Sequence, residues 1–311
     1  MTPTATAVES RQIGRWTGVT RRRKEGAAVW VLRLFAAISV LTTLGIVWVL
    51  ASESYEFFRH VPLREFLTDK EWTPLFSNKH FGIAPLLVST LLVTAIACAV
   101  AVPLGLLAAV GLYAYLPGRL ARKVKPILEL LAGIPAVVYG YFALLAVTPV
   151  IQKLIPRTAV FNAASAGIVM GMMILPMVAS LSEDALSAVP KSIVEGAYAL
   201  GATRPAAIFR VVFPAALGGI VASVILAVSR AIGETMIVAI AMGQQPRLTL
   251  DPLVPSETMT AYIVQVSLGD TPRGTLEYQT IFAVGATLFV ISMLLNLASV
   301  RFVRRFREAY E

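Results

Sequence analysis

Apolar residues fill six long windows of the chain, and polar residues gather in the segments between them. The windows cover about residues 28–51, 83–115, 127–149, 163–182, 214–243 and 279–300. About 20 consecutive apolar residues let a helix cross a bilayer, and a helix satisfies its backbone polar groups internally. The pattern therefore predicts an all-α membrane protein with six transmembrane helices.

The second window is longer than one bilayer crossing requires, and no charged residue interrupts residues 81–116. Pro103 and Gly105 lie inside it. Proline kinks a helix, and a long apolar helix fits a bilayer by tilting or bending. We therefore expect one long kinked helix here, with a tight hairpin of two helices as the alternative.

Composition points to a protein embedded in lipid. Hydrophobic residues make up 57% of the 311 residues and charged residues only 14%, against roughly one quarter charged in soluble domains. The net charge of +9 comes from residues that flank the apolar windows, so nucleic-acid binding is not expected. The single cysteine, Cys98, excludes an internal disulfide and a site of several thiolates. His60 and His80 share one polar segment, where solvated surface residues are expected and a metal site is not.

Basic residues indicate how the chain crosses the membrane. Lysines and arginines are concentrated at both ends and in alternate connecting segments, which predicts that both termini are cytoplasmic. A seventh span would place the cluster from Arg301 to Arg307 outside. The apolar segment that follows the basic start is too long for a signal-peptide core, so we expect a retained first span. We expect cytoplasmic tails at residues 1–26 and 303–311 and one transmembrane domain at residues 27–302.

Two opposite charges interrupt the fifth window. Arg230 and Glu234 lie in an otherwise apolar stretch, where an ionised side chain costs roughly 2.5–3.5 kcal/mol. Residues four apart share one helix face, so we expect each charge to neutralise the other while a path beside them is empty. The planar fork of arginine suits a tetrahedral oxyanion, and Glu234 could accept a hydrogen bond from a protonated one. Alternatively, the pair only locks this helix against its neighbours.

Ser229 and Thr235 flank the charge pair and are further candidates for the lining of such a path. Hydroxyl side chains in apolar helices also bond back to their own backbone. Ser229 and Thr235 either line the path or bond to their own backbone, and the sequence favours neither alternative.

The segment between the fourth and fifth windows, residues 190–214, reads as two short helices with a bend. Ser192 and Glu195 have the spacing of a capping box that would start the first helix. Gly201 suits the left-handed conformation that ends a helix, and Thr203 with Pro205 offers a new start. This segment is predicted to lie along the membrane surface, and an ordinary amphipathic interfacial helix is the alternative.

The same segment resembles the coupling loop of permeases from binding-protein-dependent ABC importers. The resemblance rests on Glu195, Gly196, Ala197, Gly201 and Pro214, with Gly196 in place of the commoner alanine. It implies that a separate ATPase subunit binds this loop and that its closure is transmitted to the membrane helices. None of the seven lysines follows a glycine, so the chain has no phosphate-binding loop of its own for ATP.

Two further stretches narrow the resemblance. Residues 131–141 (LAGIPAVVYGY) and residues 229–235 (SRAIGET), with the continuation TMIVAIAMG, resemble C-type permeases of the bacterial phosphate-specific ABC transport system. The resemblance implies a type I permease bundle of six helices in the bacterial inner membrane that imports inorganic phosphate. It implies as partners a homologous A-type permease, two ATP-binding cassette ATPases and an extracytoplasmic phosphate-binding protein. ATP would be used by the ATPases, with no cofactor in this chain.

Three functions other than phosphate import are alternatives for this sequence. A permease for sulfate or molybdate would have the same fold, although such permeases usually continue with Phe-Gly-Ala after the glutamate, where Thr235, Met236 and Ile237 stand here. A passive anion channel is not excluded by the residues. An intramembrane enzyme is disfavoured, because the apolar windows contain no cluster of histidine, aspartate or cysteine that could serve catalysis.

Overall fold

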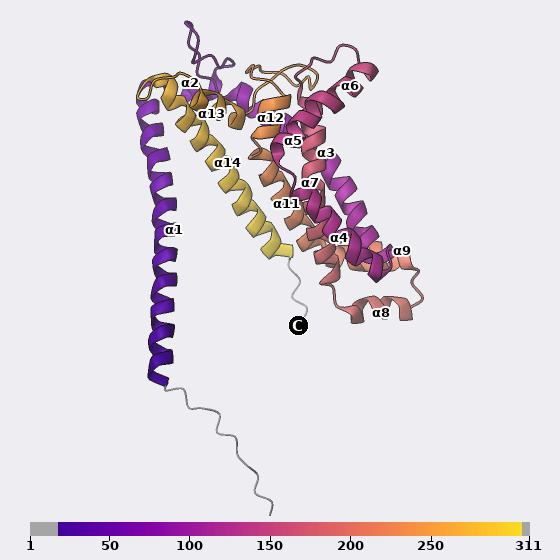
Figure 1. Cartoon of the computed structure of the whole chain (residues 1–311). Helices are drawn as coiled ribbons and strands as arrows, with labels where there is room; N and C mark the ends of the chain where they lie inside the picture. Colours follow the sequence, from indigo (N-terminus) through magenta and orange to yellow (C-terminus); the bar gives the residue numbers. More distant parts are fainter. Residues whose placement is uncertain (1–17, 307–311) are drawn as a thin grey trace, which may run out of the picture. The chain divides into compact units, whose positions relative to one another are not determined.

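The computed structural model describes residues 18–306, with side chains at residues 29–120, 123–128 and 130–301 (Figure 1). The outer parts of the two predicted tails, residues 1–17 and 307–311, lie outside the described residues. The chain is helical nearly throughout its described part, as predicted. One isolated antiparallel bridge, between Trp72 and Phe81, occurs outside the helices.

The longest connections between the helices are residues 69–83 and residues 242–258. Three of the helices contain or continue into π-helical turns, labelled η1 to η3. In chain order the elements are α1 (Gly18–His60), α2 (Leu63–Thr68), α3 (Ala84–Val110), η1 (Gly111–Tyr115), α4 (Gly118–Ala132), α5 (Ala136–Phe142), η2 (Ala143–Val147), α6 (Thr148–Leu154), α7 (Ala163–Ser187), α8 (Lys191–Ala199), α9 (Arg204–Ala207), η3 (Ile208–Val212), α10 (Phe213–Ala215), α11 (Leu217–Ile232), α12 (Met236–Ala241), α13 (Met259–Leu268) and α14 (Leu276–Phe306).

Six stretches of the described chain match the six apolar windows. Five helices are long and apolar enough to cross a membrane: Val29–His60, Ala84–Tyr115, Ala136–Leu154, Ala163–Ser187 and Leu276–Arg301. The sixth is a bent pair, in which Arg204–Ala215 meets Leu217–Ile232 at 69°. The second window forms one uninterrupted helical stretch with Pro103 inside it, which confirms the single helix.

Two of the predicted spans are broken. The third window, predicted at residues 127–149, is interrupted at residues 133–135 between α4 and α5. Pro135 lacks an N–H and restricts Ile134, so a helix cannot run through this point without losing a hydrogen bond. The fifth window, predicted at residues 214–243, ends its helix at Ile232, and α12 starts anew at Met236.

The chain divides into two compact parts, residues 1–52 and residues 53–311. The described portion of the first part is the larger share of α1. Its apolar side chains are exposed along its length, with Trp30 70% and Trp48 75% exposed. A helix with apolar residues on all sides and no polar face is typical of a lipid-exposed span.

The second part, residues 53–311, is built around the close pairing of α3 with α7. Gly167 and Gly171 of α7 are one helical turn apart, and both face α3. A Cβ added at Gly167 would lie 2.7 Å from Ile96, and one at Gly171 would lie 2.8 Å from the carbonyl oxygen of Ala97. Small residues at this spacing let two membrane helices approach closely, where dispersion contacts hold them together. Ser182 of α7 also shares a hydrogen bond of 2.7 Å with Ser223 of α11.

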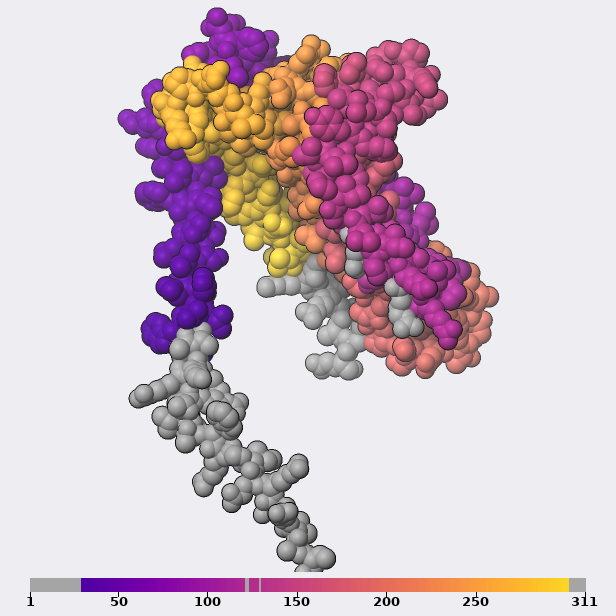
Figure 2. Space-filling view, viewed as in Figure 1, coloured from indigo at the N-terminus to yellow at the C-terminus, as the bar shows by residue number. Residues whose placement is uncertain are grey.

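Residues 53–311 have two distinct ends (Figure 1). Helices α8 and α9 lie at one end, and α2, α6 and α13 lie at the other. Helices α4 to α6, magenta to pink in Figure 2, cover one side of the bundle between these ends. We refer to the end with α8 and α9 as the α8 end and to the other as the α13 end.

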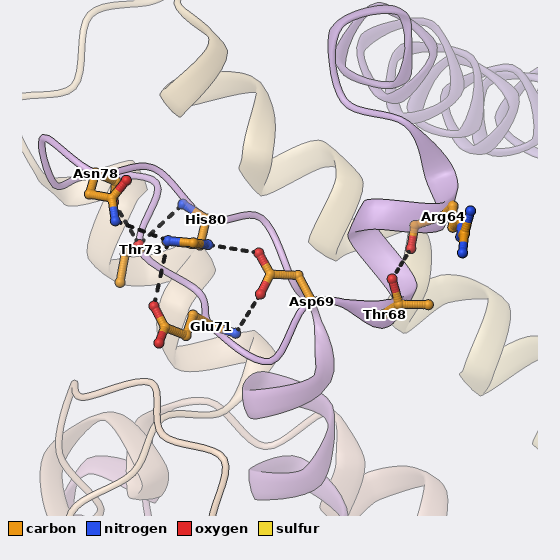
Figure 3. Close-up of polar contacts among 7 residues, drawn as sticks. All are labelled: Arg64, Thr68, Asp69, Glu71, Thr73, Asn78 and His80. Carbon is orange, nitrogen blue, oxygen red and sulfur yellow. Dashed lines mark hydrogen bonds and ion pairs between the residues drawn. The ribbon is translucent and has the colours of Figure 1, made fainter.

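A loop at the α13 end is held by a charged histidine cluster (Figure 3). Nδ1 of His80 lies 2.9 Å from Oδ2 of Asp69, and its Nε2 lies 3.6 Å from Oε2 of Glu71. The backbone N–H of His80 donates to Oγ1 of Thr73. Gly82 closes the loop, and no other residue fits there because an added Cβ would lie 2.1 Å from the carbonyl oxygen of Asp69. His80 therefore has its hydrogen-bond and ion-pair partners within this loop and helps to fix the conformation of the loop.

We predict that Gly171→Ala destabilises the protein by about 1–3 kcal/mol, because the new methyl group has no space between α7 and α3. The thermal unfolding of the purified protein in detergent measures this. Gly196→Ala is the matched control: no atom lies within 4 Å of a Cβ at Gly196, and alanine is favoured in a helix by about 0.5–1 kcal/mol. Equal unfolding temperatures for Gly171→Ala and the wild type would contradict the close approach of the two helices.

We also predict that the loop of residues 69–82 loosens as pH rises. The hydrogen bond to Asp69 raises the pKa of His80 above its usual value of 6.5. A raised pKa in the folded state means that the stabilisation is complete below about pH 6.5 and is lost as pH rises through the raised pKa. Hydrogen–deuterium exchange, corrected for the intrinsic exchange rate, should show stronger protection near pH 6 than near pH 8. His80→Gln should remove this difference, and an unchanged pH dependence in that variant would contradict the assignment.

Candidate substrate path and coupling surface

Arg230 lies in a groove on the side of the bundle. The groove has a volume of about 470 Å³ and is lined by the end of α4, by α7 and by α11. Its lining residues are otherwise apolar or hydroxyl-bearing: Ala132, Met173, Pro176, Met177, Ser180, Leu181 and Leu226. With a rise of about 1.5 Å per residue, Arg230 is about 20 Å along α11 from Leu217, well inside the span. The groove therefore presents one guanidinium at membrane depth.

The predicted pairing of Arg230 with Glu234 is wrong for this structure. Helix α11 ends at Ile232, so the two residues do not share a helix face. Within the described part of the chain, Arg230 is exposed and forms no ion pair or hydrogen bond. Residues four apart share a face only in a continuous helix, and this helix ends before Gly233.

Glu234 holds the start of α12 in place. Its Oε1 accepts hydrogen bonds from the backbone N–H groups of Met236 at 3.1 Å and Ile237 at 3.3 Å. Its carbonyl oxygen accepts a hydrogen bond of 2.7 Å from Oγ1 of Thr260. These are the donors that the first turn of a helix leaves unsatisfied, and a carboxylate near them is favoured by the helix dipole. Glu234 therefore stabilises the interrupted backbone and links it to α13.

The two neighbouring candidates do not line the groove. Ser229 has a buried hydroxyl without a hydrogen-bond partner among the described residues. Thr235 donates to the carbonyl oxygen of Gly233 at 3.3 Å, within the break itself. Of the four residues predicted for a substrate path, the structure thus places only Arg230 at the groove, and the role of the others stays a prediction.

The two sequence stretches of the phosphate-permease resemblance meet in space. Residues 131–141 contain the break between α4 and α5, and residues 229–235 contain the break between α11 and α12. Helices α5 and α12 pack together, and a Cβ added at Gly140 would lie 3.0 Å from Ile240. Non-helical backbone at membrane depth is tolerated where protein buries it or where it lines a water-filled cavity. The two breaks therefore lie next to one another beside the groove, where the packing of α5 against α12 covers part of the interrupted backbone.

At the α8 end, the predicted pair of short helices is confirmed. Helix α8 ends at Ala199, Gly201 follows with a φ of +83°, and α9 begins at Arg204 with Thr203 as its N-cap residue. A positive φ is strained for any residue with a Cβ, so glycine is required at this bend. The predicted capping box is wrong: Pro190 is the N-cap residue of α8, and no side chain caps this helix.

The coupling candidates present an exposed surface. Glu195, Gly196 and Gly201 are exposed, and Leu200 beside the bend is 91% exposed. The bend between α8 and α9 therefore lies at the surface of the described chain. Pro214 lies where η3 leads into α10, just before the 69° bend into α11.

The opposite side of this turn is fixed to the bundle. Ala197 is 9% exposed, and Val194 and Ile208 pack with the ends of α3 and α7 in one apolar cluster. The guanidinium of Arg204 stacks over the ring of Tyr115 at 5.2 Å. Buried contacts therefore join the turn of α8 and α9 to the ends of α3 and α7.

A three-residue charge cluster was not predicted from the sequence. Nζ of Lys125 on α4 donates to Glu183 at 2.7 Å and to Asp184 at 2.6 Å, both on α7. It joins the helix that borders the groove to the helix that lines it. Nothing in the sequence pairs residues 58 positions apart, so only the fold reveals this contact.

No three histidine, cysteine, aspartate or glutamate side chains in the described chain lie close enough together to hold a metal ion. The chemistry that the described residues offer is thus a guanidinium in a groove and a rigid exposed turn.

Comparison with known proteins places this geometry in a family. Residues 101–308 match the family described as binding-protein-dependent transport system inner membrane component. The chain belongs to this family. Its members are permeases of ABC transporters, and a permease of this kind works with an ATPase and a substrate-binding partner.

The chain is also similar to individual permeases of ABC transporters. The chain is 35% identical over 233 residues to a probable ABC transporter permease protein, YqgH, of Bacillus subtilis, and the match covers 75% of each chain. It is 35% identical over 247 residues to phosphate transport system permease protein PstC 1 of Mycobacterium tuberculosis, covering 73% of each. It is 30% identical over 296 residues to PstC of Mesorhizobium japonicum, covering 89% of this chain and 86% of the relative.

Solved structures show the same fold. A bacterial ABC transporter involved in the import of the acidic polysaccharide alginate aligns with a TM-score of 0.61 at 16% identity, over 93% of this chain and 100% of that one. The MetNI methionine ABC transporter aligns with a TM-score of 0.54 at 20% identity, over 73% and 95%. The predicted fold class, a type I ABC importer permease bundle, is confirmed.

We predict that Gly201→Asp leaves the protein inserted but uncoupled. A side chain at a φ of +83° strains the bend, and the new charge lies beside Leu200 on the exposed turn. Transport and substrate-stimulated ATP hydrolysis of the reconstituted assembly should both fall at least tenfold. Gly196→Ala, on the same turn, should retain both activities. ATP-driven transport at the wild-type rate in Gly201→Asp would contradict a coupling role for the turn.

Proposed function

We propose that the chain is the membrane permease subunit of an ATP-driven importer of inorganic phosphate. The observation that carries the proposal is the unpaired guanidinium of Arg230 in a groove at membrane depth. The substrate class is supported by the relatives, which include phosphate transport system permeases from several bacteria at 29–35% identity.

Arg230 suits an anion that must bind and leave again. A guanidinium stays charged at every physiological pH and offers paired donors to a tetrahedral oxyanion. No carboxylate of the described chain pairs with the guanidinium of Arg230. Phosphate is therefore the partner that neutralises this charge while it moves through the path. The remainder of the groove is largely apolar, so the attraction is local and release remains fast.

The groove opens outward from the chain, so a second subunit is needed to enclose it. An exposed guanidinium in contact with acyl chains is costly, which favours a covering protein surface. A homologous A-type permease is the covering subunit that we propose, with the substrate path between the two chains. Ser229, Glu234 and Thr235 support this path by shaping the break at its edge.

The turn formed by α8 and α9 is the proposed site for the ATPases. Two ATP-binding cassette subunits would supply the energy, and ATP would be bound there, with no cofactor in this chain. An extracytoplasmic phosphate-binding protein would deliver phosphate to the α13 end. In this assembly the chain is a transport subunit of the bacterial inner membrane with both termini in the cytoplasm. Alternating access would expose Arg230 first to the outer side and then to the inner side.

Sulfate and molybdate are tetrahedral oxyanions that a guanidinium also binds, so substrate competition is the deciding test. Proteoliposomes that contain the whole assembly should take up labelled phosphate only with ATP. Excess phosphate should suppress this uptake, and excess sulfate or molybdate should leave it unchanged. Uptake of phosphate without ATP would indicate a passive channel and contradict the proposal.

We predict that Arg230→Gln and Glu234→Gln have different effects. Arg230→Gln should lower phosphate uptake by at least tenfold while the unfolding temperature stays unchanged, since Arg230 has no partner in the described chain to lose. Glu234→Gln keeps an oxygen that accepts the two backbone hydrogen bonds, so uptake should fall by less than about threefold.

Glu234→Ala is the control for the structural role of Glu234. It removes the acceptor and should destabilise the protein by about 0.5–2 kcal/mol, the usual effect of losing a helix cap. Wild-type uptake in Arg230→Gln would remove Arg230 from the substrate path.

A further inference from the structure

A second pocket lies at the α13 end, away from the groove of Arg230. It has a volume of about 500 Å³ and is formed by the loop of residues 72–76, the loop of residues 244–247 and α13. The loop of residues 72–76 belongs to the segment that the His80 cluster holds in place. A pocket with walls fixed in this way is ready to receive a ligand without large rearrangement.

Glu257 forms part of the inner wall of this pocket. It is 0% exposed, and neither carboxyl oxygen has a hydrogen-bond partner among the described residues. Burial raises the pKa of Glu257 to about 8. A buried carboxyl group without a partner is costly, so Glu257 calls for a contact from outside the described chain, such as a water, an ion or a ligand.

Aromatic and apolar side chains surround the carboxyl group. Trp72 and Tyr262 line the pocket, with their rings 5.1 Å apart in an edge-to-face arrangement. Leu75 and Phe76 form part of the rim and are 44% and 66% exposed. An apolar rim around a desolvated polar centre is the arrangement found at the energetic centres of protein interfaces.

A protein side chain fits this pocket better than an inorganic ion. No second acidic residue lies close enough to complete a metal site among the described residues. The indole of Trp72 lies beside Tyr262 in the same wall, so the group that lacks a partner in this pocket is the carboxyl group of Glu257. A lysine or arginine offers a cation on an apolar stem that fits between the two rings.

We propose that Glu257 is the docking point for a basic side chain of the extracytoplasmic binding protein, which enters the pocket between Trp72 and Tyr262 and pairs with the carboxylate. This inference rests on the proposed function, because it assigns the α13 end to the outer side where that partner arrives. Arg247 of the same chain also lines the pocket and has no partner among the described residues, so it is the competing occupant.

Proton release gives the interaction a pH signature. The free carboxyl group binds a proton below about pH 8, and pairing with a cation requires its loss. Affinity should therefore rise from about pH 6.5 to about pH 8.5 and then level off. The other ionisable groups that line the pocket are Arg247 and Tyr262, and burial raises the pKa of Tyr262. His80 holds the loop that forms one wall of the pocket and loses its proton as pH rises, so the pH dependence is measured in a His80→Gln background, where Glu257 supplies the rise.

The test measures binding of the extracytoplasmic binding protein to the complete importer in nanodiscs by surface plasmon resonance. Glu257→Gln should weaken binding at least tenfold and abolish the rise with pH, while the unfolding temperature stays at or above that of the wild type. Asp270→Asn is the matched control. It changes an exposed carboxylate near the same end that has no partner in the described chain, and it should alter affinity by less than about twofold.

A scan of lysine and arginine to glutamine on the binding protein identifies the other half of the pair. One of these substitutions should lower the affinity for the wild-type importer about tenfold and leave the affinity for the Glu257→Gln importer unchanged. Unchanged binding by Glu257→Gln, or the lack of any coupled basic residue, would overturn the proposal. Arg247→Gln should leave the affinity at least as high as in the wild type. If Arg247→Gln instead lowers the affinity as much as Glu257→Gln does, and the double variant loses no more, then Arg247 fills the pocket. That result would also overturn the proposal.

Phosphate uptake by the same preparation separates this inference from the proposed function. If the importer takes up phosphate and the Glu257→Gln importer binds the binding protein as tightly as the wild type does, only the docking point is refuted. Weakened binding by Glu257→Gln in an importer that carries another anion would support the docking point and refute only the substrate.

Discussion

An arginine that has no partner in the described chain, held at membrane depth, is the constraint on which the rest of this structure depends. Arg230 lies two residues before the end of α11, in a groove whose other lining residues carry no charge. An isolated guanidinium is tolerated there only if water, an anion or another subunit meets it. The breaks at residues 133–135 and 233–235 lie beside the groove, and Glu234 is occupied in holding the second break in shape. The carboxylate that could have neutralised Arg230 is thus committed elsewhere, which leaves the guanidinium without a partner in the described chain.

The same helix that lines the groove also reaches the coupling surface. Helix α7 contributes Pro176 and Ser180 to the groove, and its end packs against the turn that carries Leu200 and Gly201. Ser182 joins α7 to α11 by a buried hydrogen bond, one turn from the groove. Helices α7 and α11 both line the groove of Arg230, so buried contacts connect the exposed turn to the groove without interruption. Under the proposed function, this continuity is the physical route from the ATPases to the substrate path.

Much of this fold could be read from the sequence, because the bilayer imposes a simple rule on composition. Runs of apolar residues located all six spans, and the glycine at position 201 located the bend between α8 and α9. The helix breaks were not predicted, since hydropathy reports which residues are apolar and not whether their backbone hydrogen bonds continue. The predicted pairing of Arg230 with Glu234 was wrong for the same reason, because it assumed that the helix continues through both residues. Lys125 and Glu257 were missed because their environment is created by segments distant in sequence, and the sequence carries no local signal for it.

The central claim is that the groove of Arg230 is a water-filled path for an anion in the assembled transporter. Ser180 lines this groove, and serine to cysteine is nearly isosteric. The chain has one native cysteine, so Ser180→Cys in a Cys98→Ala background places a single thiol in the groove. Its reaction with a negatively charged, membrane-impermeant methanethiosulfonate reagent in the complete importer is the most direct measurement. Our account predicts that the thiol reacts in at least one nucleotide state and that phosphate slows the reaction. A thiol that stays inert to this reagent in every state, while a lipid-soluble maleimide still modifies it, would contradict the account.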